Sequence, residues 1–132
     1  MLLRLFAVIL ALSATPTGAQ QNYPTPRERL ADTGGAFLKT CAVVEKPTKN
    51  LSRSELLDAN YCAAYLTGFV DALQVTAELY REPVACFPED GIDVREATKI
   101  VLAYIREKPE RRERTTAVLV GAALARAFPC RK

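Results

Sequence analysis

The sequence predicts an all-α fold: a compact, bundle-like domain of four antiparallel helices that is held by two disulfides. Three observations support this class. Apolar residues recur at a period near 3.6 in four stretches, prolines separate these stretches, and the strand-like alternation of apolar and polar residues is absent. The expected helices cover residues 28–44, 53–81, 94–107 and 110–128.

The start of the chain reads as a signal peptide. Arg4 precedes a short apolar run over residues 5–12, and small residues follow as far as Ala19. The run is much shorter than the ~20 apolar residues of a spanning helix, although a retained anchor is the alternative. We expect cleavage after Ala19, a periplasmic location, and a single helical domain over residues 20–132 with no membrane association.

The first helix is predicted by an apolar stripe and a proline stop. Gly34 and Gly35 weaken its first half, since each glycine inside a helix costs up to ~1 kcal/mol, and a start near Thr33 is the alternative to Glu28. Pro47 ends the stretch. The stripe consists of Leu30, Phe37, Leu38, Cys41 and Val44.

The second helix is the longest. Ser52 and Glu55 have the spacing of a capping box, and no helix breaker follows before Pro83. Two adjoining apolar stripes predict that other helices surround this one, which makes it the centre of the domain. One stripe is Leu57, Tyr61, Ala64, Gly68, Ala72, Val75 and Leu79, and the other is Cys62, Leu66, Phe69, Leu73, Ala77 and Tyr80.

Two further helices complete the domain. Asp93 and Glu96 repeat the capping-box spacing before a helix that continues to Glu107. Pro109 suits the first turn of a last helix over residues 110–128. Small residues in that helix allow close packing.

The four cysteines predict two disulfides, because an even count in a small exported chain is typical of a disulfide framework. A zinc site is the alternative, but the close C-x2-C spacing of such sites is missing. In an antiparallel arrangement, Cys41 and Cys62 lie toward one end of the domain, whereas Cys86 and Cys130 lie at the other. We therefore expect the pairs Cys41–Cys62 and Cys86–Cys130.

Composition disfavours an enzyme. The chain has no histidine, which removes the Ser-His-Asp and Cys-His arrangements and the commonest metal ligand, so we expect no cofactor. Asp71 is interpreted as a buried structural carboxylate that pairs with a backbone amide or with an arginine, for which Arg95 and Arg126 are the candidates. The alternative makes Asp71 and Glu78 the acids of a hydrolase or transferase. Removing residues 1–19 lowers the formal net charge from +3 to +2, so nothing suggests a nucleic-acid partner.

Two surface segments are candidates for binding a partner. The first is a loop after Cys86 that consists of Phe87, Pro88, Glu89, Asp90 and Gly91, in which Phe87 would be an apolar knob. A solvated turn is the alternative interpretation. The second is the basic cluster over residues 106–114, which we interpret as a solvated face, with a patch for an acidic partner or lipid head groups as the alternative.

Several stretches of the chain also carry a family resemblance. "YCAAYLTGFVDAL", "CFPEDGI" and the closing "ALARAFPC" are similar to the Rap1a/Tai family of type VI secretion immunity proteins. The similarity extends from about Gly35 to Cys130. It carries the scaffold residues Cys62, Gly68, Asp71, Cys86, Pro88 and Cys130 but identifies no binding site.

The resemblance implies a function. Members of this family are small exported helical proteins, and characterised ones are dimers that block the active site of a peptidoglycan amidase effector. We therefore expect a periplasmic inhibitor that is not an enzyme and that forms a homodimer. A periplasmic acid or stress chaperone, or another helical binding module, is the alternative.

Overall fold

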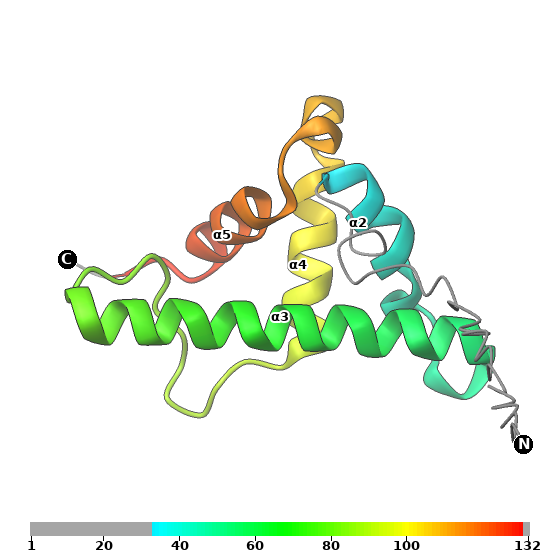
Figure 1. Cartoon of the computed structure of the whole chain (residues 1–132), viewed down its shortest axis with the longest axis horizontal. Helices are drawn as coiled ribbons and strands as arrows, with labels where there is room; N and C mark the ends of the chain where they lie inside the picture. Colours follow the sequence, from blue (N-terminus) through cyan, green and yellow to red (C-terminus); the bar gives the residue numbers. More distant parts are fainter. Residues whose placement is uncertain (1–32, 131–132) are drawn as a thin grey trace, which may run out of the picture.

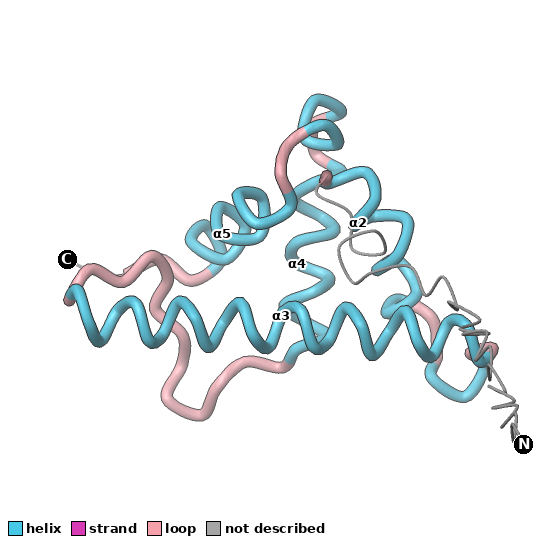
Figure 2. Tube along the Cα trace, in the orientation of Figure 1, coloured by secondary structure: helices cyan, strands magenta, loops and turns pink. Residues whose placement is uncertain are grey.

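The structure, a computed structural model, describes residues 33–130, so the predicted signal peptide and the arm after it lie outside the described residues. Figure 1 shows how the α-helices of this part are arranged and connected, and Figure 2 shows that helices and loops make up residues 33–130. The α-helices are α2 (Gly34–Cys41), α3 (Arg53–Tyr80), α4 (Val94–Arg106) and α5 (Thr116–Ala127), and the 3₁₀ segments are η1 (Ala42–Glu45), η2 (Thr48–Asn50) and η3 (Pro109–Glu113). The predicted all-α fold class is confirmed. Within residues 33–130, no helix is long and apolar enough to cross a membrane.

Helix α4 is the centre of the domain. It packs against α2, α3 and α5, as its place between them in Figure 1 shows. Its buried side chains come from both sides of one broad apolar face: Ala97, Thr98, Val101, Leu102 and Ile105. The prediction that the second helix is central was wrong. Only Cys62, Leu66 and Val70 of α3 are buried, because the other helices cover a single side of it.

Helix α2 begins at the glycine pair Gly34 and Gly35. Thr33 caps it, since its side chain accepts a hydrogen bond from the amide of Ala36 at 3.4 Å. A methyl group at Gly34 would lie 2.5 Å from the carbonyl oxygen of Arg111 and 2.6 Å from a methyl group of Leu119. The absence of a side chain at Gly34 thus lets α2 touch η3 and α5. The start near Thr33 is confirmed, and residues 28–32 lie outside the described part.

The predicted last helix is broken. The prediction of one helix over residues 110–128 was wrong, because Arg114 has an extended backbone and Thr115 a non-helical one between η3 and α5. The carbonyl of Arg114 accepts the amide of Gly34 at 2.9 Å, and Thr33 and Thr115 form an isolated antiparallel bridge. This contact between distant segments takes the place of helical hydrogen bonds. Pro109 opens η3, in agreement with its expected first-turn position.

The two longest helices start at the predicted caps. Ser52 and Glu55 form a complete capping box, in which each side chain accepts a hydrogen bond from the other residue's amide. Asp93 accepts the amide of Glu96 at 2.9 Å, whereas the Glu96 carboxylate binds Lys99 instead of completing a box. Arg81 ends α3 in the left-handed conformation, with φ of 56°.

Both predicted disulfides are confirmed. Cys41 and Cys62 join the end of α2 to α3 and are fully buried. Cys86 and Cys130 join the segment after α3 to the segment after α5. These two bridges include every cysteine of the described chain, so none of them is a free thiol.

Candidate partner-binding site

The predicted recognition loop contains a tight turn at the surface. The amide of Gly91 donates to the carbonyl of Pro88 at 3.0 Å, which closes a four-residue turn with Glu89 and Asp90 at its tip. Gly91 has φ of 88°, a conformation that favours glycine. All four residues are exposed. The turn thus presents two neighbouring carboxylates on a constrained backbone.

Both ends of this turn are fixed to the domain. On one side, Cys86 forms its disulfide and donates its amide to the carbonyl of Phe128 at 2.9 Å. The ring of Phe87 lies 5.3 Å from the ring of Phe128. On the other side, Ile92 packs against the core. Phe87, which we expected to be an apolar knob of this loop, is instead half-buried and packs against the core, so it anchors the loop.

Asp71 is not buried. It lies on the exposed side of α3, where solvent can hydrate its carboxylate. The two arginines considered as its partners bind elsewhere: Arg95 contacts Thr48 and Lys46, and Arg126 contacts Glu107. The interpretation of Asp71 as a buried structural carboxylate was therefore wrong. Glu78 is exposed on the same helix, and it is not among the residues that line the pocket of about 150 Å³ beside Asp71.

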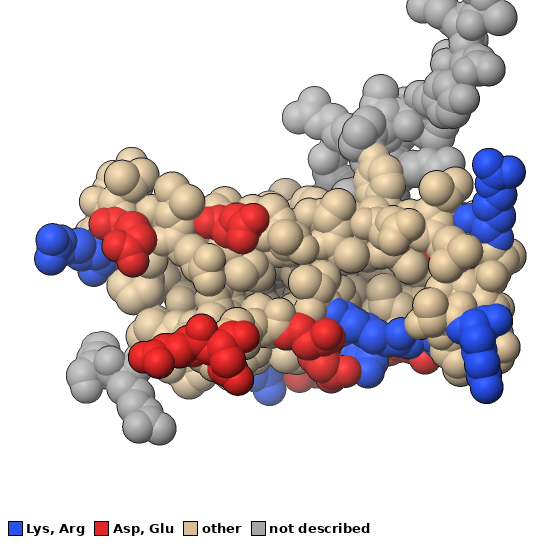
Figure 3. Space-filling view, turned by 90° about the horizontal axis from the view of Figure 1, so that it is seen from below, with Lys and Arg blue, Asp and Glu red and all other residues tan. Residues whose placement is uncertain are grey.

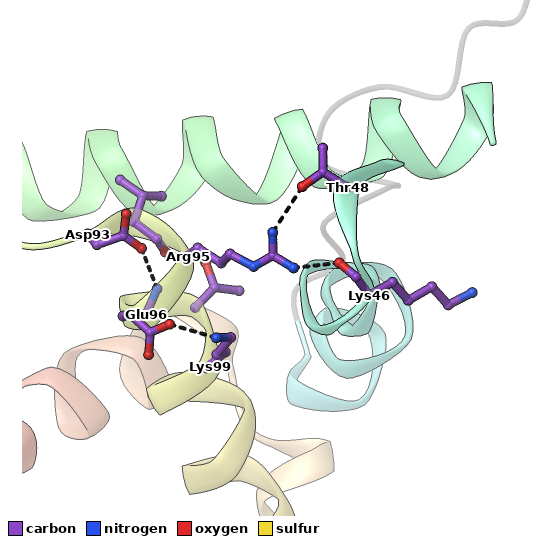
Figure 4. Close-up of polar contacts among 8 residues, drawn as sticks. Lys46, Thr48, Asp93, Arg95, Glu96 and Lys99 are labelled. Carbon is purple, nitrogen blue, oxygen red and sulfur yellow. Dashed lines mark hydrogen bonds and ion pairs between the residues drawn. The ribbon is translucent and has the colours of Figure 1, made fainter. Parts of the chain in front are cut away.

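Arg95 marks a groove that sequence reasoning missed. Figure 4 shows its guanidinium reaching from α4 to the segment before α3, where it donates to Thr48 Oγ1 at 3.1 Å and to the carbonyl of Lys46 at 2.5 Å. The groove beside it has a volume of about 300 Å³. It is mainly apolar, and its lining includes Val44, Leu51, Leu56, Ala59 and Val94. Two hydrogen bonds to protein groups hold the Arg95 side chain in place, so it braces one wall of the groove.

Two of the five basic residues in the cluster over residues 106–114, Arg106 and Arg111, make side-chain contacts within the domain. Arg106 forms a bidentate pair with Glu45, at 2.6 and 2.8 Å. Hydrogen bonds from Arg106 lower the pKa of Glu45. Arg111 lies 3.5 Å from the centre of the Tyr104 ring. Arg111 and Arg126 both bind Glu107, and the hydrogen bond from Arg126 is the main cause of its lowered pKa.

A second surface becomes visible only in three dimensions, on the outward side of α3. Its large apolar side chains are well exposed: Leu57 is 52% exposed, Val75 57% and Leu79 71%. Ala64, Gly68 and Ala72 lie between them and are exposed as well. The sequence identified this stripe but placed it in the core, because periodicity shows which residues share a face and not what covers that face.

Residues 33–130 hold neither a metal-binding cluster nor a free cysteine. Residues 33–130 contain no group of three or more Cys, Asp or Glu side chains placed to hold a metal ion. Every cysteine there is bonded to another cysteine. Two exposed features stand out on the described surface: the constrained acidic turn at residues 88–91 and the apolar outer face of α3.

Comparisons with known proteins identify the scaffold. The sequence model described as Rap1a immunity proteins matches residues 33–130, the whole described domain. Neither the curated proteins nor the solved structures gave a match. The matched range includes both disulfides, all four helices and the turn, so the resemblance seen in the sequence is confirmed. The chain belongs to the Rap1a immunity protein family.

Proposed function

We propose that this chain is a periplasmic immunity protein of a type VI secretion system, and that it inhibits a peptidoglycan amidase effector as a homodimer. The family match over residues 33–130 carries this proposal. The two disulfides support an oxidising compartment such as the periplasm. The amidase and the homodimer come from the resemblance described above.

The turn at residues 88–91 is the proposed inhibitory element. It is narrow, exposed and closed by its own hydrogen bond, so it can enter a cleft without rearranging. The Cys86–Cys130 disulfide and the Phe87–Phe128 contact hold its base. Because the free protein already orders the turn, binding loses little conformational entropy.

The chemistry of the tip fits a hydrolase cleft. Glu89 and Asp90 are exposed and make no ion pair with residues 33–130, so both carboxylates are available to a partner. Inserted into a cleft, they would accept hydrogen bonds from the donors that bind the substrate. Inhibition would then result from exclusion of the peptidoglycan strand and requires no chemical step.

The partner is tested by capture. The tagged protein is mixed with secreted and periplasmic fractions of its source, and bound proteins are identified by mass spectrometry. A single stoichiometric amidase whose activity falls on binding is the expected result. A different effector enzyme would overturn the amidase assignment, and many weak clients bound only at acid pH would favour the chaperone alternative.

The inhibitory turn is tested by charge reversal. Glu89→Lys with Asp90→Lys should weaken binding of the captured enzyme at least tenfold and leave the thermal midpoint unchanged, because both side chains are exposed. Glu110→Lys with Glu113→Lys is the matched control, since it makes the same charge change at exposed positions of η3. Equal inhibition by both double variants would exclude the turn.

A further inference from the structure

The outer face of α3 has an internal symmetry about Gly68. Leu57 and Leu79 lie eleven residues before and after it, and Tyr61 and Val75 lie seven before and after. Ala64 and Ala72 lie four residues to either side. Residues at these spacings share one face of a helix. Reading the face in either direction therefore gives large apolar residues outside and small residues in the middle.

Such a face is complementary to itself when it is turned end for end. A twofold axis at Gly68 would place a residue before Gly68 opposite the residue equally far after Gly68 on the second copy. The two residue numbers then add up to 136, so that Leu57 meets Leu79 of the second copy. An isologous interface of this kind needs the same patch to serve on both copies. Ala64, Gly68 and Ala72 would let the two helix backbones approach closely at the centre, where a bulky side chain would separate them.

We infer that a second copy of this chain covers this face, with the two α3 helices packed antiparallel about Gly68. The inference names the surface of the proposed homodimer and rests on that part of the proposed function. It does not depend on which enzyme is inhibited. Across Leu57 to Leu79 the paired helices would be in contact over about 33 Å, at a rise of 1.5 Å per residue.

The charges along α3 give fewer like-charge pairings in the antiparallel direction than in the parallel one. Figure 3 shows the domain from below, where red side chains lie in the left and central part of the view, and blue ones lie at both ends and along the lower edge right of centre. Arg53 is exposed at the start of α3, whereas Glu78 and Glu82 are exposed at and just after its end. A parallel pair would place each charge beside its own copy. In the antiparallel pair, Arg81 lies opposite Glu55, and Arg53 lies opposite position 83, next to Glu82. Glu78 then lies opposite Asp58, which is the one pairing of like charges among these positions.

The monomer has room for a disruptive side chain at the proposed axis. A methyl group built at Gly68 meets nothing within 4 Å. Gly68→Arg should therefore leave the fold of one copy intact and should not lower its helicity, because arginine is a better helix former than glycine. Any loss of the dimer by this variant would then report on the surface and not on unfolding.

The first test measures mass by light scattering during size-exclusion chromatography, over a hundredfold range of protein concentration. The wild type should give twice the monomer mass, and Gly68→Arg should give the monomer mass with an unchanged circular-dichroism spectrum. Gln74→Arg is the control, because it adds the same side chain at an exposed position of α3 on a different side. A dimer that survives Gly68→Arg overturns this interface but leaves the homodimer, whereas a monomeric wild type overturns both.

The second test determines the direction of the helices. Ala64→Cys and Ala72→Cys proteins carrying different tags are mixed and oxidised mildly, with the native disulfides intact. The antiparallel pair predicts cross-links between position 64 of one copy and position 72 of the other. Cross-links of position 64 to itself, at the expense of the mixed product, would show a parallel pair and overturn the inference.

Discussion

The two disulfides should differ in what they contribute to stability, and burial should reverse the order that loop length predicts. Loop closure alone favours the Cys86–Cys130 bridge, which spans 44 residues against 21 for Cys41–Cys62. We predict nevertheless that replacing Cys41 and Cys62 together by alanine destabilises the domain more than replacing Cys86 and Cys130 together.

The magnitudes follow from loop length and burial. The chain-entropy relation gives about 3.3 kcal/mol for the 21-residue separation and about 4.0 kcal/mol for the 44-residue separation. Cys41 and Cys62 are 0% exposed, whereas Cys86 is exposed. Removing each buried sulfur atom adds on the order of 1 kcal/mol for lost packing and the cavity left behind. The expected losses are thus about 5 kcal/mol for the buried bridge and about 4 kcal/mol for the exposed one.

Urea unfolding monitored by circular dichroism measures this difference. The free energy extrapolated to water is the quantity to compare, since loss of a cross-link also expands the unfolded state and changes the slope. A lower stability for the Cys86→Ala, Cys130→Ala protein would refute the reasoning, because loop entropy would then outweigh core packing.

The same burial difference predicts the order of reduction. A thiol reagent must reach a sulfur atom before it can attack. In the native protein, dithiothreitol should open the Cys86–Cys130 bridge first, and alkylation followed by mass spectrometry should find Cys41 and Cys62 still joined. Simultaneous labelling of all four cysteines would contradict this expectation.

Three further predictions concern single positions. Gly34→Ala should lower stability by about 1–3 kcal/mol, because the new methyl group would lie 2.5 Å from a backbone carbonyl oxygen. Gly35→Ala should be neutral or stabilising by up to about 1 kcal/mol, since the nearest atom to its methyl group would be 3.4 Å away. Equal thermal midpoints of the two variants would contradict this prediction. Hydrogen bonding from Lys46 lowers the pKa of Glu55 to about 2, so its carboxylate favours the folded state above pH 4.5 and loses that effect as the pH falls toward 2. The thermal midpoint of Glu55→Gln should therefore fall less between pH 5 and pH 2.5 than that of the wild type, and parallel curves would contradict the assignment. Leu102→Ala should cost about 2–5 kcal/mol in urea unfolding because Leu102 is fully buried, and a loss below 1 kcal/mol would show that the core collapses around the gap.

Local signals predicted the parts of the fold that depend on neighbouring residues. Ser52 and Glu55 marked the start of α3 because a capping box satisfies the backbone within three residues. The disulfide pairing followed from the positions of the cysteines along the expected helices. The family resemblance came from the same fixed points of the scaffold.

The parts of the fold that depend on contacts between distant residues could not be predicted from local sequence patterns. The gap before α5 exists because the amide of Gly34 binds the carbonyl of Arg114, which no local pattern reveals. Asp71 was expected to be buried only because α3 was expected to be surrounded. An apolar stripe has the same pattern whether its own domain or a second molecule covers it, so the outer face of α3 could be located from the sequence but not assigned.

The two disulfides follow one another along the chain without overlapping. The loop closed by Cys41 and Cys62 ends before the loop closed by Cys86 and Cys130 begins. A chain that enters an oxidising compartment from its N-terminus would expose the first pair before the second. An oxidant that joins cysteines in their order of appearance would therefore produce the native pairing directly. Oxidative folding of this protein should then need a thiol oxidase but no disulfide isomerase.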